Sequence, residues 1–391
     1  MKERLKYPLS IYVVWHPLFD EGEKFANEIY SHFCRNVKNP LERALGIPVY
    51  FRSAVNEDDK PVPIEINKAT KNAIVLLVDQ NYLIDESFKA YTKELRELVD
   101  EESRIYPIQL CEEAYALGCG INEYQFTRAF YGDLKKKKNY KTSSQIIRTE
   151  LLNNLARLLL GLKSTWNDEE KDRPNSPVKL FLSHAKKDGV ETTTKFKRFV
   201  EENLKLDVFF DTFDIADGYN FKNQIEQNIE NSALVVFLTD EYSTREWCKI
   251  EVLTAKRRKS SIVVVHKLKK GERRAFPYLG NVPTVVAPRN EEDVFAEIVD
   301  KTLFQVLNNV YQRKLLTNFS SLFEKADTDF IILSSPPELF NYLDIYKKKR
   351  SSRKKVIVLY PEPPLGNEEL KVLNDVDEEI KFITPIQLPT L

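Results

Sequence analysis

The sequence lacks the glycine-rich loops with which many α/β proteins bind nucleotide phosphates. No Gly-x-Gly-x-x-Gly follows a first strand and no P-loop pattern is present, which excludes a Rossmann dinucleotide site and a P-loop nucleotide site. The four cysteines (Cys34, Cys111, Cys119 and Cys248) contain no Cys-x-x-Cys pair. This spacing argues against a zinc module and gives no disulfide framework, so we expect reduced, mostly buried thiols.

The sequence also lacks an excess of charge and a long apolar run. Lys and Arg together number 59, as do Asp and Glu, so no overall field recruits nucleic acid or an anionic membrane. No apolar stretch is long enough to span a bilayer, and residues 1–8 lack the hydrophobic region of a signal peptide. We therefore expect a cytoplasmic protein without a membrane partner. A length of 391 residues predicts two or three domains.

The first part of the chain alternates apolar runs with amphipathic segments. This β-α-β alternation predicts a parallel sheet with helices on both faces. The expected strands are 10–16, 47–51, 73–78 and 104–110, and the expected helices are 21–35, 65–70, 87–102 and 144–162. Residues 164–177, rich in charge, Pro and Ser, are expected to form a linker. The first domain is thus assigned to residues 1–163.

The order of elements repeats after the linker, which indicates a duplicated architecture. The expected strands are 178–182, 207–211, 233–238, 261–265 and 284–287, and the expected helices are 191–204, 221–231, one from about residue 243 and 291–311. These elements assign a second domain to residues 178–311. Residues 312–391 are expected to form a short α/β segment, with strands 330–333, 356–360 and 380–383, a helix at 338–346 and a basic linker at 347–355.

The chemical signal is densest just after the apolar strand 233–238. Open α/β sheets bind ligands at the carboxyl ends of their strands, and residues 239–251 occupy that position. Trp247 and Glu251 are four residues apart in the following helix and so share a face. An indole beside a carboxylate at the end of a strand favours a site for a flat, cationic ring.

Four fragments, in this order, resemble a bacterial TIR (Toll/interleukin-1 receptor) domain over about residues 177–310. They are Phe181-Leu-Ser-His-Ala-Lys-Lys-Asp188, Val208-Phe-Phe-Asp211 with the long loop after it, the strand that ends in Thr239-Asp-Glu-Tyr-Ser243, and Trp247-x-x-x-Glu251. The resemblance implies tandem flavodoxin-like α/β domains, the first of them a degenerate TIR-like copy. It also implies cleavage of the nicotinamide–ribose bond of NAD+, with Glu251 as the catalytic carboxylate and Trp247 as its flanking aromatic. The loop from Thr212 to Asn220 matches the family's BB loop, which joins subunits and gates the site.

The chemistry of NAD+ agrees with a single carboxylate. Nicotinamide is cationic in NAD+ and leaves as a neutral molecule, so no general acid is required, unlike in ordinary glycosidases. Glu251 would bind the ribose hydroxyls and stabilise the oxocarbenium-like charge, and Trp247 would stack on the nicotinamide. NAD+ is then a substrate, and no cofactor or metal is expected. Further candidates for the nucleotide pocket are Phe181, Ser183, His184 and Asp211.

Ordinary structural roles compete with these assignments. Trp247 is also explained as a core residue and Glu251 as a surface carboxylate, while His184 either holds its loop or contacts phosphate. Cys248 has no positioned histidine in the sequence, so we assign it no nucleophilic role. The first unit has no counterpart of Trp247, and Glu94 matches Glu251 only if a small insertion is allowed. The basic runs at 135–138 and 347–355 are read as solvated turns, with partner or nucleic-acid binding as the alternative.

The resemblance leads us to expect an NAD+-consuming effector of bacterial anti-phage immunity. It would assemble as a homo-oligomer through the loop from Thr212 to Asn220, in response to an activator protein or a nucleic-acid or nucleotide trigger. It would act by NAD+ depletion or by an ADP-ribose-type signal. Two alternatives stay open: a non-catalytic scaffold that recruits another effector, and a sensor in which the first domain or the C-terminal segment binds a nucleotide messenger.

Overall fold

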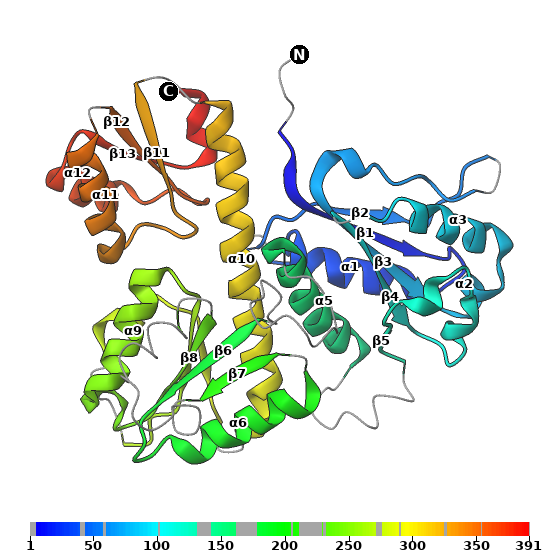
Figure 1. Cartoon of the computed structure of the whole chain (residues 1–391), viewed down its shortest axis with the longest axis horizontal. Coiled ribbons are helices and arrows are strands. Elements are labelled where there is room, and N and C mark those ends of the chain that lie inside the picture. Colours follow the sequence, from blue (N-terminus) through cyan, green and yellow to red (C-terminus); the bar gives the residue numbers. More distant parts are fainter. Residues whose placement is uncertain are drawn as a thin grey trace, which may run out of the picture.

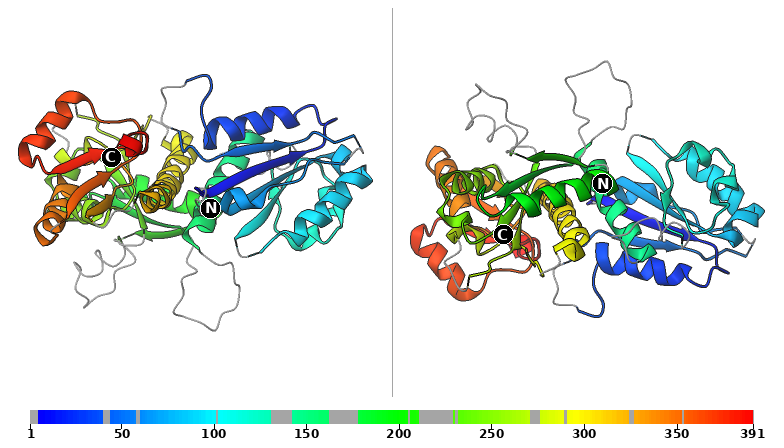
Figure 2. Two further views of the ribbon diagram at one scale, coloured as in Figure 1. Left: turned by 90° about the horizontal axis from the view of Figure 1, so that it is seen from above. Right: turned by 90° about the horizontal axis from the view of Figure 1, so that it is seen from below.

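Three parallel sheets are arranged around one long helix in the computed structural model (Figure 1). The residues that the structure describes are 5–39, 44–57, 60–100, 102–130, 142–161, 178–204, 206–210, 229, 232–270, 276–288, 291–323, 327–352 and 354–390. The expected linker at 164–177, the basic run at 135–138, the helix at 221–231 except Ile229, and the loop from Thr212 to Asn220 lie outside them. Figure 2 shows the first unit on one side of the long helix and the other two units beyond it.

The first unit has the strand order β2-β1-β3-β4-β5, with every described pairing parallel. Its strands are β1 (Tyr7–Trp15), β2 (Val49–Arg52), β3 (Ala69–Val78), β4 (Ser103–Gln109) and β5 (Thr127–Arg128). Its helices include α1 (Gly22–Phe33), α2 (Gln80–Ile84), α3 (Glu86–Glu97) and α5 (Ser143–Leu160). Apolar residues of α1 and α5 cover one face of the sheet and those of α2 and α3 cover the other.

The second unit repeats this order, as β7-β6-β8-β9-β10, again with parallel pairings. Its strands are β6 (Lys179–His184), β7 (Asp207–Phe210), β8 (Ser232–Leu238), β9 (Ile262–His266) and β10 (Thr284–Val286). Helices α6 (Val190–Asn203) and α10 (Phe295–Leu322) cover one face, and α9 (Glu246–Arg258) covers the other. The strand order 2-1-3-4-5 is that of flavodoxin-like folds, so the tandem α/β prediction is confirmed.

The third unit is a smaller α/β layer. Its strands β11 (Thr328–Ile332), β12 (Lys355–Leu359) and β13 (Ile380–Ile383) form a parallel sheet in the order β11-β12-β13. Helices α11 (Leu339–Ser351) and α12 (Asn367–Val376) cover one face. The C-terminal part of α10, with Leu316 and Phe319, covers the other face.

Helix α10 belongs to all three units. Its first half packs in a continuous apolar cluster that includes residues of both larger sheets, and its last turns pack on the third. Polar contacts fix its position: the hydroxyl of Tyr311 donates to the carbonyl of Gly46 (3.2 Å), and Asn309 Nδ2 donates to Ser261 Oγ (2.8 Å). The three units are therefore held around one shared element.

Several elements differ from the sequence prediction for physical reasons. Residues 65–70 hold only a 3₁₀ turn at Ile66–Lys68, because Ala69 already pairs with Tyr7 in the sheet. The helix expected to end at residue 311 continues to Leu322, since its apolar pattern goes on against the third sheet. The basic segment expected as a linker at 347–355 is partly the end of α11. Helix α12 was missed: it is short, and its turns expose Val372 and Val376.

Candidate functional site

Glu251 lies in a closed position where α9 crosses the carboxyl end of β6. Its side chain is only 3 % exposed, among the apolar residues that α9 packs on the sheet. Burying a carboxylate is costly unless it accepts hydrogen bonds, so its partners decide whether this position is stable. The Ser183 hydroxyl, at the penultimate residue of β6, donates a short hydrogen bond to Glu251 Oε2.

Tyr242 extends this contact into a chain of three side chains. Its hydroxyl lies 2.5 Å from Ser183 Oγ, and both residues are buried. Because Ser183 has one hydroxyl proton and donates it to Glu251, Tyr242 must be the donor to Ser183. The direction is thus from Tyr242 to Ser183 to Glu251. The sequence singled out Ser183 and Glu251 but gave Tyr242 no role; its place four residues after the end of the buried strand β8 was the available signal.

The alternation of β6 sends its candidate residues to opposite faces of the sheet. Phe181 and Ser183 point to the α9 face, where Phe181 packs on Phe209 with ring centroids 5.0 Å apart. His184 points to the other face and packs on Phe210, with centroids 4.7 Å apart. Phe181 is completely buried and His184 nearly so. In this structure both side chains pack in the interior of the domain and neither is accessible to a ligand.

Trp247 is placed differently from Glu251 although the two are one helical turn apart. Its side chain is 46 % exposed, at the first turn of α9. The structure therefore brings together Ser183 and Glu251, while Trp247 presents its indole to the outside of the same helix end. Asp211 lies outside the described residues.

The loop after β6 is joined to the loop after β8 by Asp188. Its two carboxylate oxygens accept from Thr239 Oγ1 (2.7 Å) and from the backbone N–H of Glu241 (3.1 Å). Lys187 adds an ion pair to Glu241, with 3.0 Å between Nζ and Oε1. These contacts hold together the two loops that border the Glu251 site. The sequence predicted no role for Asp188 beyond its place in the motif.

Residues 180–298 match the family model described as TIR domain. The second unit is a TIR domain. None of the curated proteins compared with the chain matched it. The match covers β6 through the first turn of α10, so it contains Ser183, Tyr242 and Glu251. It does not reach the first unit or the third.

Cys248 has a structural place in the TIR domain. Its Sγ lies 3.4 Å from the carbonyl oxygen of His184, and the thiol is buried under α9. All four cysteines of the chain are free thiols, with Cys111 and Cys248 buried and Cys34 and Cys119 partly buried. Among the described residues, no group of three or more His, Cys, Asp or Glu side chains is arranged to hold a metal ion. Nor is any described helix long and apolar enough to cross a membrane.

The first unit repeats the scaffold of the TIR domain with different side chains at the corresponding place. The hydroxyl of Tyr82, in α2 after β3, lies 2.9 Å from Thr92 Oγ1 of helix α3, whereas the partner of Tyr242 is Ser183 on strand β6. Phe88, four residues before Thr92, is buried where Trp247 is exposed. Glu94, the carboxylate considered in the sequence, is exposed, and Thr92 occupies the buried position. Among the described residues, the buried position near Tyr82 is therefore filled by apolar side chains and the hydroxyl of Thr92.

Proposed function

We propose that the TIR domain cleaves the nicotinamide–ribose bond of NAD+ and that Glu251 is its catalytic carboxylate. The observation that supports this is the buried chain from Tyr242 through Ser183 to Glu251 at the carboxyl ends of the strands. A carboxylate held by a hydrogen bond in a low-dielectric position is suited to stabilise a developing positive charge on ribose. Nicotinamide leaves as a neutral molecule, so one carboxylate is enough, and water or a ribose hydroxyl then attacks the sugar.

The exposure of the two principal residues points to a resting state. Glu251 is closed off while Trp247 is half exposed, so NAD+ cannot reach both in this arrangement. Catalysis then requires that α9 or its bordering loops move, exposing the carboxylate and leaving the indole to stack on the nicotinamide ring. TIR domains commonly self-associate, and we propose that assembly in the cytoplasm supplies this movement. An effector that stays closed until assembled fits a role in anti-phage defence, where uncontrolled NAD+ loss would kill the host.

The test is nicotinamide release from NAD+ by wild type and Glu251→Gln over a wide range of protein concentrations. Gln keeps the shape and an acceptor oxygen for Ser183 but removes the charge. The matched control is Glu246→Gln, since Glu246 lies on the same helix with its side chain 76 % exposed. Release that rises more than linearly with wild-type concentration, is lost in Glu251→Gln and is retained in Glu246→Gln supports the proposal. Equal rates in all three proteins contradict it.

A non-catalytic scaffold is the second candidate, and the burial of Glu251 favours it. A carboxylate whose only task is to accept the hydrogen bond from Ser183 would be a structural group of the fold. In that case Glu251→Gln would leave cellular toxicity or defence intact, while substitutions in the loop from Thr212 to Asn220, such as Asp217→Ala, would abolish it. Catalysis predicts loss in both variants, so measuring both phenotypes separates the two functions.

A further inference from the structure

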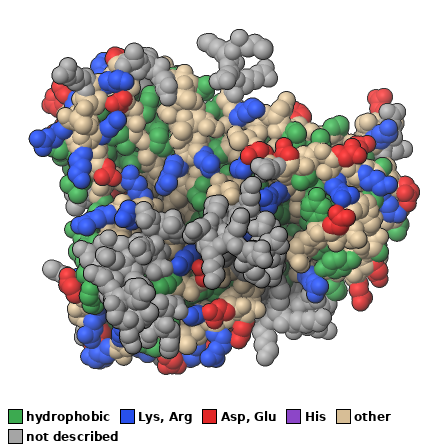
Figure 3. All heavy atoms as spheres, in the orientation of Figure 1, with side chains coloured by type: hydrophobic (Ala, Val, Ile, Leu, Met, Phe, Trp, Pro, Cys, Tyr) green, Lys and Arg blue, Asp and Glu red, His purple; other side chains and the backbone are tan. Residues whose placement is uncertain are grey.

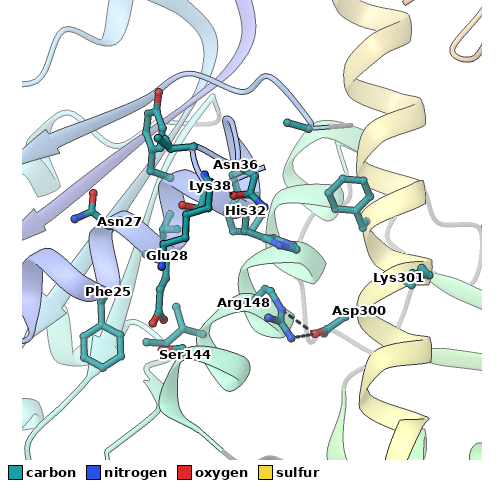
Figure 4. Close-up of a pocket in the computed structure, with 18 of the residues that line it drawn as sticks. Phe25, Asn27, Glu28, His32, Asn36, Lys38, Ser144, Arg148, Asp300 and Lys301 are labelled. Atoms are coloured by element: carbon teal, nitrogen blue, oxygen red, sulfur yellow. Dashed lines mark hydrogen bonds and ion pairs between the residues drawn. The ribbon is translucent and has the colours of Figure 1, made fainter. Parts of the chain in front are cut away.

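A large cavity lies between the first unit and the TIR domain, away from Glu251. Its volume is about 1150 Å³, and its walls come from α1, α5 and α10. This is at or above the upper end of the range for small-molecule sites, which lie preferentially where domains meet. Figure 4 shows Arg148 on α5 paired with Asp300 on α10, and His32 on α1 pointing toward α10 above this pair, so side chains of three helices converge there.

The cavity combines apolar rings with polar groups. Phe25 and Phe304 contribute rings from opposite sides, and the ring of His32 meets that of Phe304 with centroids 5.5 Å apart. Side-chain amides and hydroxyls complete the wall; they belong to Asn27, Asn36, Gln305 and Ser144. An aromatic surface on which a planar group can pack, together with amides that can hydrogen-bond to its edge, is a means by which proteins bind flat heteroaromatic rings.

Cations on the cavity wall are only partly neutralised by carboxylates of the described chain. Arg148 is held by Asp300, with Nη2 and Oδ2 2.6 Å apart, and Lys301 lies 4.0 Å from Glu297. Lys24 and Lys38 have no ion pair among the described residues, and Glu28 is the remaining carboxylate of the wall. The backbone N–H groups of Lys38 and Asn39 donate to Asn36 Oδ1 (3.1 and 3.2 Å), which fixes the turn that carries Lys38.

The interface at this cavity also contains an incompletely satisfied group. Nε2 of His32 is closed off from solvent and has no hydrogen-bond partner within the described part of the chain. Burial, with a smaller contribution from the charge of Arg148, lowers the pKa of His32 to about 3. The ring is therefore neutral at physiological pH. A buried nitrogen without a hydrogen-bond partner costs free energy, so a small change in the packing of α1 on α10 can improve this interface.

We propose that this cavity binds a nucleoside phosphate, with its base against the ring pair formed by His32 and Phe304 and its phosphate at Lys24 and Lys38. The rings and amides account for a planar base, and the two lysines account for an anion. Because the ligand would contact α1, α5 and α10 together, its binding would set how the first unit packs against the helix that closes the TIR domain. This site is separate from Glu251 and does not depend on the NAD+ reaction.

The experiment measures binding in a Glu251→Gln background, so that turnover at the TIR site adds no heat. Isothermal titration calorimetry is carried out with AMP, GMP, CMP and UMP, with the four matching nucleosides, and with inorganic phosphate. The same probes are titrated into Lys24→Glu/Lys38→Glu. The control is Lys93→Glu, since Lys93 is exposed on α3, which covers the opposite face of the first sheet. Lys24, Lys38 and Lys93 are exposed, so their substitutions are expected to leave the fold of the Glu251→Gln background unchanged.

The expected result is that at least one monophosphate binds with a Kd below about 1 mM, at least tenfold more tightly than its nucleoside. The double variant loses at least tenfold, and Lys93→Glu is unchanged. In hydrogen exchange, the same nucleotide protects α1 and the first half of α10. The proposal is overturned if no monophosphate binds, if the double variant binds as tightly as its parent, or if the nucleoside or inorganic phosphate alone binds equally well.

Discussion

Lys256 on α9 and Glu338 at the start of α11 form an ion pair, with 2.7 Å between Nζ and Oε2, that joins the helix carrying Glu251 to the third unit. Their side chains are 9 % and 24 % exposed. A second pair, between Lys259 and Asp344 (3.5 Å), lies at the end of the same helix. The position of the candidate catalytic carboxylate is thus fixed from the TIR sheet on one side and from the third unit on the other.

We expect these two residues to be energetically coupled. Glu338→Ala leaves Lys256 largely buried without its partner, so each single substitution should lower stability by about 1–3 kcal/mol, somewhat less than a fully buried pair because Glu338 is partly exposed. A double-mutant cycle measured by urea unfolding should give a coupling of at least about 0.5 kcal/mol. The pair Lys371 and Glu368, exposed on α12, is the control and should show little coupling. Strict additivity at Lys256 and Glu338 would refute the coupling.

Ser183→Ala tests the hydrogen-bond chain at the site. The substitution removes a donor from the buried carboxylate of Glu251 and an acceptor from Tyr242, so we expect a loss of about 1–3 kcal/mol. Chemical unfolding of wild type, Ser183→Ala and Tyr242→Phe measures this. The effects of the two substitutions should be less than additive, because both break the same chain. A Ser183→Ala protein as stable as wild type would show that the chain contributes nothing to the folded state.

The first unit is expected to take no part in NAD+ cleavage. Glu94 is exposed on α3, and Thr92 fills the buried place one turn beyond Phe88, so no carboxylate is held there as Glu251 is held. Glu94→Gln should leave nicotinamide release at the wild-type rate, whereas Glu251→Gln should abolish it. A large decrease in Glu94→Gln, with unchanged oligomeric state by light scattering, would assign chemistry to the first unit.

His32 predicts a dependence of stability on pH. Its pKa is lowered in the folded state from 6.5 to about 3, so the unfolded chain binds the extra proton between these values. The stability contribution is full above about pH 6.5 and is lost as the pH falls toward 3, by up to about 1.4 kcal/mol per pH unit. His32→Phe keeps a ring and removes this loss. As the pH falls, the urea midpoint of His32→Phe should therefore rise relative to that of wild type.

Asp300, which faces the same cavity, contributes with the opposite sign. Burial raises its pKa despite the opposing charge of Arg148, so its contribution decreases as the pH rises through the folded pKa. Wild type and His32→Phe share Asp300 and Arg148, and the comparison between them isolates the histidine. A difference that stays constant from pH 7 to pH 4 would contradict the assignment of His32 as a buried neutral ring.

The sequence was sufficient for the fold class because its signals are local. Uninterrupted runs such as Ala233-Leu-Val-Val-Phe-Leu238 can form only buried strands when helical segments alternate with them, and the repeated order then fixes the topology. Long-range packing was not readable in the same way. The helix expected to end at residue 311 continues to Leu322, because what covers its last turns is a sheet that follows it in the chain.

The candidate site was readable in part for the same reason. The spacing of Trp247 and Glu251 placed both on one end of one helix, but spacing does not determine which side chain is buried, and here the carboxylate is enclosed and the indole exposed. The partners of Glu251 come from two other elements, β6 and the turn after β8, which meet only in the folded sheet. The cavity at His32 had no sequence signal, since its three helices belong to two different units.

The shared position of α10 has a consequence for how the protein can be divided. A fragment ending at residue 311 would cut through a helix of 28 residues and remove Leu316 and Phe319 together with the third sheet, against which they lie. A fragment beginning at residue 178 would uncover the surface of α10 that packs on the first unit. Neither cut falls at a place where few contacts cross. The TIR domain is therefore best studied by point substitution in the full chain. Excision would change the solubility and the folding cooperativity of the fragment, and a loss of activity could then not be assigned to the active site.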